Sequence, residues 1–131
     1  MAAFLRVIVR PATLPGDCEA VTIIAGRRAV VLFDPRRTAS AHRLRWNIAH
    51  ELGHVVCGHT ARGQVAEAEA NWFAACLLMP GAWLLCDLGH ANAPARASEH
   101  RLRAQYQVGR QSFHIRIRQV LPEGRRPTAT G

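Results

Sequence analysis

Two histidines and a glutamate form the run with the clearest chemical meaning in the sequence, His50-Glu51-Leu52-Gly53-His54. On a helix, positions i and i+4 lie on one face, so His50 and His54 can both direct a ring nitrogen at one metal ion about 2 Å away. Glu51 lies about 100° around the helix from His50, outside the set of metal ligands but beside a metal-activated water. A carboxylate there can take the proton of that water as it attacks a carbonyl. The run therefore predicts a zinc site that hydrolyses peptide bonds, with Glu51 as general base.

A third zinc ligand is expected from the next helical stretch, because a catalytic zinc needs three protein ligands and one open position. That stretch offers two acids, Glu67 and Glu69. If the chain reverses midway between the two stretches, His54 is level with Glu67 and His50 with Asn71. Glu67 and Asn71 are i and i+4 and share a face, whereas Glu69 is about 200° around the helix from Glu67. We predict one zinc ion per chain, bound by His50, His54 and Glu67, with Asn71 supporting a ligand histidine. Alternatively, Glu67 and Glu69 only stabilise the first turn of their helix through its dipole.

The stretches that must position these residues predict an α+β fold, with a small antiparallel N-terminal sheet followed by a helical core. Residues 3–9, 20–25 and 29–33 are rich in β-branched and apolar side chains, and the last two runs read as a hairpin. Thr38 or Ser40 can cap the helix that carries the two histidines. The helical periodicity predicts helices over 40–59, 64–79, 83–88, 96–106 and 110–121.

The length of 131 residues predicts one domain over residues 1–121, with the sheet at about 3–33 and the helical core at about 40–121. Residues 122–131 are polar, contain two prolines and two glycines, and are predicted to be a disordered tail. The apolar runs are too short to span a membrane, and the first ten residues lack the pattern of a signal peptide. These two features predict a cytoplasmic protein. The four cysteines show no CxxC spacing and are expected to be reduced thiols.

The residues just described resemble the ImmA/IrrE family of zinc peptidases. The resemblance rests on RLRWNIAHELGH at residues 43–54 and EAEANWFAACLLMP at residues 67–80, and extends more loosely to residue 121. It implies a zincin-like helical core with zinc on His50, His54 and Glu67, and Glu51 as general base. It also implies a metallo-endopeptidase whose polypeptide substrate is typically a helix-turn-helix repressor, so that cleavage regulates transcription. Only 12 residues, 55–66, separate His54 from Glu67; this is shorter than the family pattern and predicts a shallower or more open cleft.

Two other functions compete with the peptidase. The net charge of +8 comes from 17 arginines without any lysine, and it attracts nucleic acid or acidic partners. Residues 102–121 resemble a helix-turn-helix in outline and carry Arg116 and Arg118, which would suit a DNA-binding module. Because the arginines are scattered, nucleic acid is not the expected partner. The other alternative is a regulatory protein that keeps a structural or inactive zinc site.

Several residues outside the motif have less specific interpretations. His59 is read as a helix-end histidine rather than a ligand. Tyr106 or one of four further histidines is expected to donate a hydrogen bond to the oxyanion of the tetrahedral intermediate, and the sequence does not choose between them. The strand at residues 28–33 is expected to offer an edge to an extended substrate. The four further histidines are His42, His90, His100 and His114.

Overall fold

The structure divides into two compact units, one extending to Ala74 and the other beginning at Ala75. It is a computed structural model that describes residues 6–38, 40–89 and 96–121. The predicted tail at residues 122–131 and the start of the first predicted strand therefore lie outside the described residues. An N-terminal sheet followed by helices is the α+β class that the sequence predicts. The single domain over residues 1–121 stays a prediction, and each unit is described by itself.

The sheet of the first unit has three strands, β1 (Arg6–Pro11), β2 (Ala20–Ala25) and β3 (Arg28–Phe33), in the order β1-β3-β2. Strands β2 and β3 form the predicted antiparallel hairpin, with Gly26 at a positive φ of 61° in its two-residue turn. The β1–β3 pair is parallel, so the sheet is mixed and not wholly antiparallel as predicted. The reason is the connection at residues 12–19, which places β2 one strand away and leaves room for β3 between β1 and β2.

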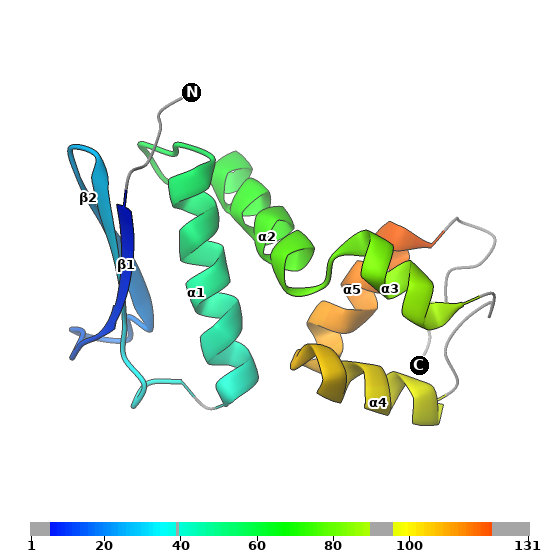
Figure 1. Ribbon diagram of the computed structural model, residues 1–131. Helices are drawn as coiled ribbons and strands as arrows, with labels where there is room; N and C mark the ends of the chain where they lie inside the picture. The colour runs from blue at the N-terminus through cyan, green and yellow to red at the C-terminus, as the bar shows by residue number, and fades with distance from the viewer. Residues whose placement is uncertain (1–5, 39, 90–95, 122–131) are drawn as a thin grey trace. The chain divides into compact units, whose positions relative to one another are not determined.

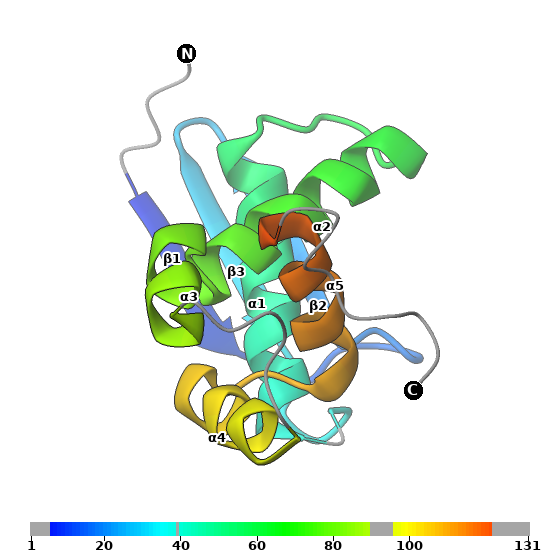
Figure 2. The same cartoon turned by 90° about the vertical axis from the view of Figure 1, so that its right-hand side faces the viewer.

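Helix α1 (Ala41–Val56) lies against the sheet and carries the histidine motif. Its N-terminus is capped by Ser40, whose hydroxyl accepts a hydrogen bond from the Arg43 backbone N–H at 3.2 Å. Buried Ala49 and Val55 on α1 contribute to the core of this unit, together with buried residues of the sheet. Helix α2 (Gln64–Leu78) lies beside α1 on the side away from the sheet (Figures 1 and 2). The first unit thus holds every residue of the predicted zinc site.

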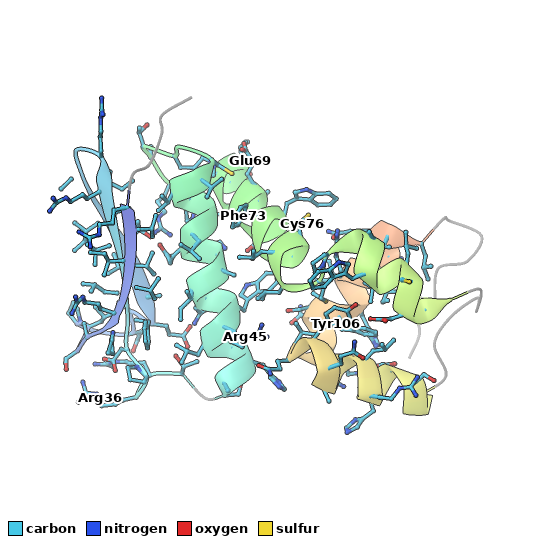
Figure 3. All side chains as sticks on the ribbon, viewed as in Figure 1. Arg36, Arg45, Glu69, Phe73, Cys76 and Tyr106 are labelled. Carbon is cyan, nitrogen blue, oxygen red and sulfur yellow. The ribbon has the colours of Figure 1, made fainter. Side chains whose placement is uncertain are left out.

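The second unit packs α3 (Gly81–Leu88), α4 (Arg96–Tyr106) and α5 (Arg110–Val120) around an apolar core. Tyr106 lies on the side of α4 that faces α3, and its hydroxyl donates to Asp87 of that helix (Figure 3). The core residues are Met79, Leu84, Leu88, Leu102, Tyr106, Val108, Phe113, Ile117 and Leu121.

Arg116, one of the arginines in the helix-turn-helix interpretation, is buried against this core. Arg116 is only 6% exposed, and its Nε donates to the backbone carbonyl of Met79 at 2.9 Å. A guanidinium that contacts a DNA phosphate must reach the surface. Burial of Arg116 therefore argues against the DNA-binding interpretation of α4 and α5.

No single helix among residues 6–38, 40–89 and 96–121 has the length and apolarity of a membrane span, and only α2 and α3 taken together as a bent pair pass that test.

Candidate metal centre

The imidazoles of His50 and His54 converge on one carboxylate of the neighbouring helix. His50 Nε2 lies 2.9 Å from one oxygen of Glu67, and His54 Nε2 lies 3.2 Å from the other. The two Nε2 atoms are 3.1 Å apart. The two histidines are one turn apart on α1 and Glu67 is in the first turn of α2. The structure thus brings the three predicted ligands together, while their role as ligands stays a prediction.

Three donors at these separations fit a tetrahedral zinc ion. Bonds of about 2.0–2.1 Å place tetrahedral ligand atoms roughly 3.3 Å apart. The two Nε2 atoms are 3.1 Å apart, and each lies 2.9 or 3.2 Å from a different oxygen of Glu67, so each separation is close to that value. Two imidazoles and one carboxylate are also ligands that zinc commonly takes, and they leave a fourth position open. The geometry and the donor types therefore fit a catalytic zinc site.

A close approach of α1 to α2 is what lets Glu67 reach the histidines. Gly53 lies between the two histidines in the motif, and a Cβ built on it would be 2.9 Å from the Cα of Ala70 and 3.1 Å from the Cβ of Phe73. Real carbon atoms in contact are about 3.5–4.0 Å apart, so no side chain fits here. The Phe73 side chain lies between α1 and α2 (Figure 3). The glycine of the motif is therefore needed for the spacing of the helices.

Asn71 supports His50, one helical turn beyond Glu67. Its Oδ1 lies 2.7 Å from His50 Nδ1, the ring nitrogen that does not face Glu67. A neutral imidazole that presents Nε2 to a metal carries its proton on Nδ1. That N–H donates to the Asn71 carbonyl oxygen, which fixes the tautomer and the orientation of the ring.

Glu51 is buried beside the two histidines and has two partners that the sequence did not identify. One ligand-type atom from each of His50, Glu51 and His54 lies within 4.8 Å of the others. The hydroxyl of Thr22 on β2 donates to Glu51 Oε2 at 2.5 Å, and the Arg62 guanidinium donates to the same oxygen at 2.9 Å. These contacts hold the carboxylate in a defined orientation next to the converging imidazoles.

The charges of the site favour the protonation states that a metal requires. Burial alone would raise the pKa of the Glu67 carboxyl, but His50, His54 and Arg62 together hold that pKa below its usual value. Burial lowers the pKa of His54, and the charges of Arg62 and His50 lower it further against the opposing effect of Glu67 and Glu51. A carboxylate and a neutral imidazole are the forms that bind zinc.

His59 contacts the predicted ligand His54, a role that its predicted position at a helix end does not indicate. Gly58 follows the C-cap of α1 with a positive φ of 71°, and its N–H donates to Val55 O while the His59 N–H donates to His54 O. This pair of bonds is the Schellman motif, which reverses the chain at a helix C-terminus. The reversal brings His59 Nδ1 to 2.9 Å from His54 Nδ1. No helical spacing could have revealed the contact, because the chain has left the helix before His59.

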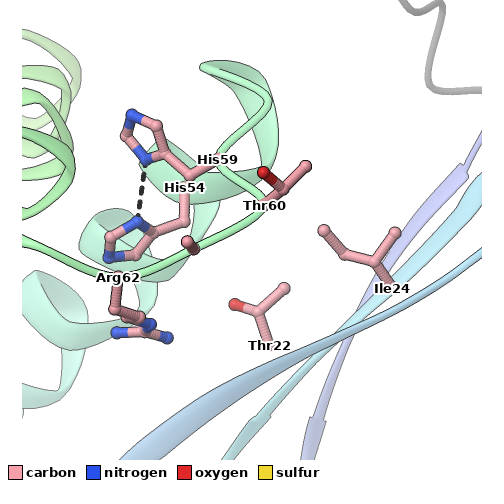
Figure 4. Close-up of a pocket in the computed structure, with 7 residues that line it drawn as sticks. Thr22, Ile24, His54, His59, Thr60 and Arg62 are labelled. Carbon is pink, nitrogen blue, oxygen red and sulfur yellow. Dashed lines mark hydrogen bonds between the residues drawn. The ribbon is translucent and has the colours of Figure 1, made fainter.

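A cavity of about 400 Å³ opens beside His54 (Figure 4). Strand β2 supplies one wall with Thr22 and Ile24, and the loop after α1 supplies the other. Seven residues line the cavity, namely Thr22, Ile24, His54, His59, Thr60, Ala61 and Arg62. The space is large enough for a few side chains of a bound peptide.

The strand predicted to receive an extended substrate is in the wrong place for that role. Strand β3 pairs with β1 on one side and β2 on the other, so its backbone N–H and C=O groups are already used. The sequence prediction failed because the order of strands depends on the path of the connection at residues 12–19. Strand β2 pairs only with β3 among the described strands, and it is β2 that lines the cavity.

Two of the candidate oxyanion donors have partners within the second unit. The Tyr106 hydroxyl donates to Asp87 Oδ2, and His114 Nε2 lies 2.6 Å from Glu99 Oε1. His90 lies outside the described residues. In the first unit, Arg62 forms ion pairs with Glu51 and Glu67, and no sequence motif indicates this role.

A comparison with protein families also indicates a peptidase. Residues 25–118 match the IrrE N-terminal-like domain, peptidase family M78, and this match includes α1, α2 and all three predicted ligands. No curated protein gives a significant match. A peptidase of this kind implies a metallopeptidase-like domain with a polypeptide substrate. Since the match covers more than half of the 131 residues, the chain belongs to the IrrE N-terminal-like peptidase family.

Proposed function

We propose that this protein is a zinc-dependent endopeptidase that binds one zinc ion through His50, His54 and Glu67. The observation that carries the proposal is the convergence of two Nε2 atoms and one carboxylate at separations of 2.9–3.2 Å. The second observation is the position of Glu51, whose carboxylate is buried within 4.8 Å of both imidazoles. Membership of a peptidase family supports hydrolysis of a peptide bond as the reaction.

Glu51, Thr22 and Arg62 each have a separate role in the proposed reaction. When bound, zinc supplies Lewis-acid chemistry, polarising the peptide carbonyl and making water nucleophilic near neutral pH. Glu51 accepts the proton of the attacking water and can return it to the leaving amine. Thr22 donates to Glu51 Oε2 and keeps the carboxylate in place. Arg62 is a cation beside the reacting groups, where it can stabilise negative charge that develops on the substrate oxygen.

An extended polypeptide is the substrate that the cavity suits best. Strand β2 has one edge free of other described strands, and Ile24 on it is 47% exposed beside the cavity. A peptide added along this edge would gain backbone hydrogen bonds and would pass in front of the converging imidazoles. Within the family resemblance, the substrate is a helix-turn-helix repressor, whose cleavage releases transcription. An extended loop of such a repressor is therefore the segment we propose to be cut.

Metal content tests the ligand set. The purified full chain is loaded with zinc, dialysed without chelator and measured by elemental analysis, and we expect about one zinc ion per chain. Glu67→Gln should lose most of it, because the substitution removes a charged ligand. Asp17→Asn is the control, since it removes an exposed carboxylate from the connection between β1 and β2, outside this site. Full zinc occupancy in Glu67→Gln would refute the ligand assignment.

Glu51→Gln separates an enzyme from a protein with an inactive zinc site. The variant should keep its zinc and lose cleavage of repressor proteins, followed as fragments by mass spectrometry. Loss of a general base typically lowers the rate about 10²–10⁴-fold. Cleavage at the wild-type rate by Glu51→Gln would show that Glu51 is not the base. Absence of any cleavage by the zinc-loaded wild type, tested against repressors of the host genome, would favour the inactive site.

A further inference from the structure

A second group of ligand-type side chains lies at the end of α1, next to the predicted zinc site. Ligand-type atoms of Cys57, His59 and Glu69 lie within 4.8 Å of one another. His59 Nε2 is 3.4 Å from Glu69 Oε2, and the His59 side chain is only 13% exposed. Glu69 lies on α2 near the end of α1 (Figure 3). Cys57 is exposed and forms no disulfide.

These three donors match the preferences of a borderline divalent metal ion. A thiolate, an imidazole and a carboxylate are each ligands of zinc, and three protein ligands leave one position open. Tetrahedral coordination needs ligand atoms roughly 3.3–3.7 Å apart. The His59–Glu69 separation of 3.4 Å already meets this requirement. Cys57 and Glu69 are both exposed, so rotation of their side chains can bring ligand atoms that already lie within 4.8 Å of one another to coordination distance.

His59 belongs to both groups through its two ring nitrogens. Its Nδ1 lies 2.9 Å from His54 Nδ1, and its Nε2 faces Glu69 (Figure 4 for the His54–His59 contact). If His54 binds zinc through Nε2, its Nδ1 carries a proton and donates to His59 Nδ1. A neutral His59 then carries its own proton on Nε2, where it donates to Glu69.

A metal ion on His59 Nε2 conflicts with this arrangement of protons. The ion needs the lone pair of Nε2, so the proton of a neutral His59 must move to Nδ1. Two N–H groups would then face each other across 2.9 Å, and one of the two rings would have to turn. Metal binding at one site should therefore weaken metal binding at the other.

We propose that Cys57, His59 and Glu69 form a second site for a thiophilic divalent cation such as Zn²⁺, and that its occupation opposes metal binding by His54. The inference rests in part on the proposed function, because the opposition requires a metal ion on His54 Nε2. The existence of the thiolate site itself is independent of catalysis. In the cell, such a site would make the peptidase sensitive to an excess of zinc.

Titration of the metal-free full chain with Co²⁺ tests the second site, since a thiolate bound to cobalt gives a charge-transfer absorption that nitrogen and oxygen ligands do not. The first equivalent should give only the weak visible bands of a site without sulfur, and these should be lost in Glu67→Gln. Further Co²⁺ should produce the thiolate band. Cys57→Ser should abolish that band, whereas Cys86→Ser, which alters another exposed cysteine, should keep it.

The outcomes distinguish the two proposals. A wild-type chain without a thiolate band, or a band that persists in Cys57→Ser, would overturn the second site and leave the catalytic site untouched. A band that depends on Cys57, found together with visible bands that do not depend on Glu67, would keep the second site and overturn the catalytic ligand set.

The opposition between the sites has its own test in His50→Ala. This variant removes a ligand of the first site but leaves the His54–His59 contact. Coupling between two binding sites is reciprocal, so an empty first site should strengthen binding at the second. Co²⁺ should bind the Cys57 site about 10–100-fold more tightly in His50→Ala than in a wild-type chain whose first site is filled. This range of about 10–100-fold is typical for loss of the support of a ligand histidine. Equal affinities in the two proteins would overturn the opposition.

Discussion

Gly53→Ala tests the claim that close contact between α1 and α2 builds the metal site. The new Cβ would be 2.9 Å from the backbone Cα of Ala70, and carbon contacts require about 3.5–4.0 Å. Helix α2 must therefore retreat by roughly 0.6–1 Å at this point. Metal ligands tolerate shifts of only about 0.2 Å, and Glu67 lies less than one turn from Ala70. We expect zinc affinity to fall about 10–100-fold, as it does when the support of a ligand is lost.

The stability of the metal-free protein is measured separately and should change by no more than the zinc affinity, whose 10–100-fold loss equals about 1.4–2.7 kcal/mol. Overpacking of this kind costs about 1–3 kcal/mol. Replacing a helical glycine by alanine stabilises the folded protein by about 0.5–1 kcal/mol, because the unfolded chain has less backbone entropy. The net loss in the free energy of unfolding should thus be about 0–2.5 kcal/mol. Urea denaturation of the metal-free protein measures the free energy of unfolding, and competition with a chromogenic chelator measures the zinc affinity.

Gly63→Ala is the matched control, because its added Cβ meets nothing within 4 Å and its φ is outside the left-handed region. This variant should bind zinc like the wild type and should be equally or slightly more stable. If Gly53→Ala folds and binds zinc as tightly as Gly63→Ala does, the spacing of the helices is not what positions Glu67.

Three further substitutions address the surroundings of the site. Asn71→Ala should lower zinc affinity about 10–100-fold in chelator competition, because His50 loses the acceptor that orients its ring; an unchanged affinity would contradict this role. Hydrogen bonds from Arg36 and from the Leu14 N–H hold the pKa of Asp34 at about 2, below its ordinary 3.8. The stabilisation from Asp34 is therefore complete above about pH 4 and is lost as the pH falls towards 2, so the unfolding free energy of Asp34→Asn should depend less on pH in this range. Equal pH dependence would show that Asp34 does not link folding to protons. Ser40→Ala should lower the free energy of unfolding by about 1 kcal/mol in urea denaturation through loss of the N-cap of α1, and no change would contradict that cap.

Local sequence patterns predicted the elements well, because each pattern is set by the element's own periodicity. Helix α2 is observed at Gln64–Leu78 where the sequence predicts residues 64–79, and β2 has the predicted bounds Ala20–Ala25. The same local reasoning placed Glu67 and Asn71 on one face of α2. Both residues contact His50 in the structure. Two helices joined by a short connection have few ways to pack, so the number of residues from the turn predicts which residues of the two helices lie side by side.

Contacts between distant elements could not be predicted in this way. Thr22 reaches Glu51 only because β2 packs against α1, and the order of strands decides which strand does so. A hairpin pattern does not say whether β1 joins the sheet beside β2 or beside β3, and this uncertainty produced the incorrect antiparallel sheet. Arg62 was missed because loop residues have no periodicity that links them to a site.

The short connection between the two motif helices explains why the site can form within so few residues. Only residues 55–66 separate His54 from Glu67, and the Schellman motif at Gly58 turns the chain immediately at the end of α1. Arg62 then bridges the carboxylates of Glu51 and Glu67 at 2.9 and 3.4 Å. Two carboxylates held near each other repel unless a cation lies beside them. The connection therefore supplies both the reversal of the chain and a cation that, with His50 and His54, holds the pKa of Glu67 below its usual value.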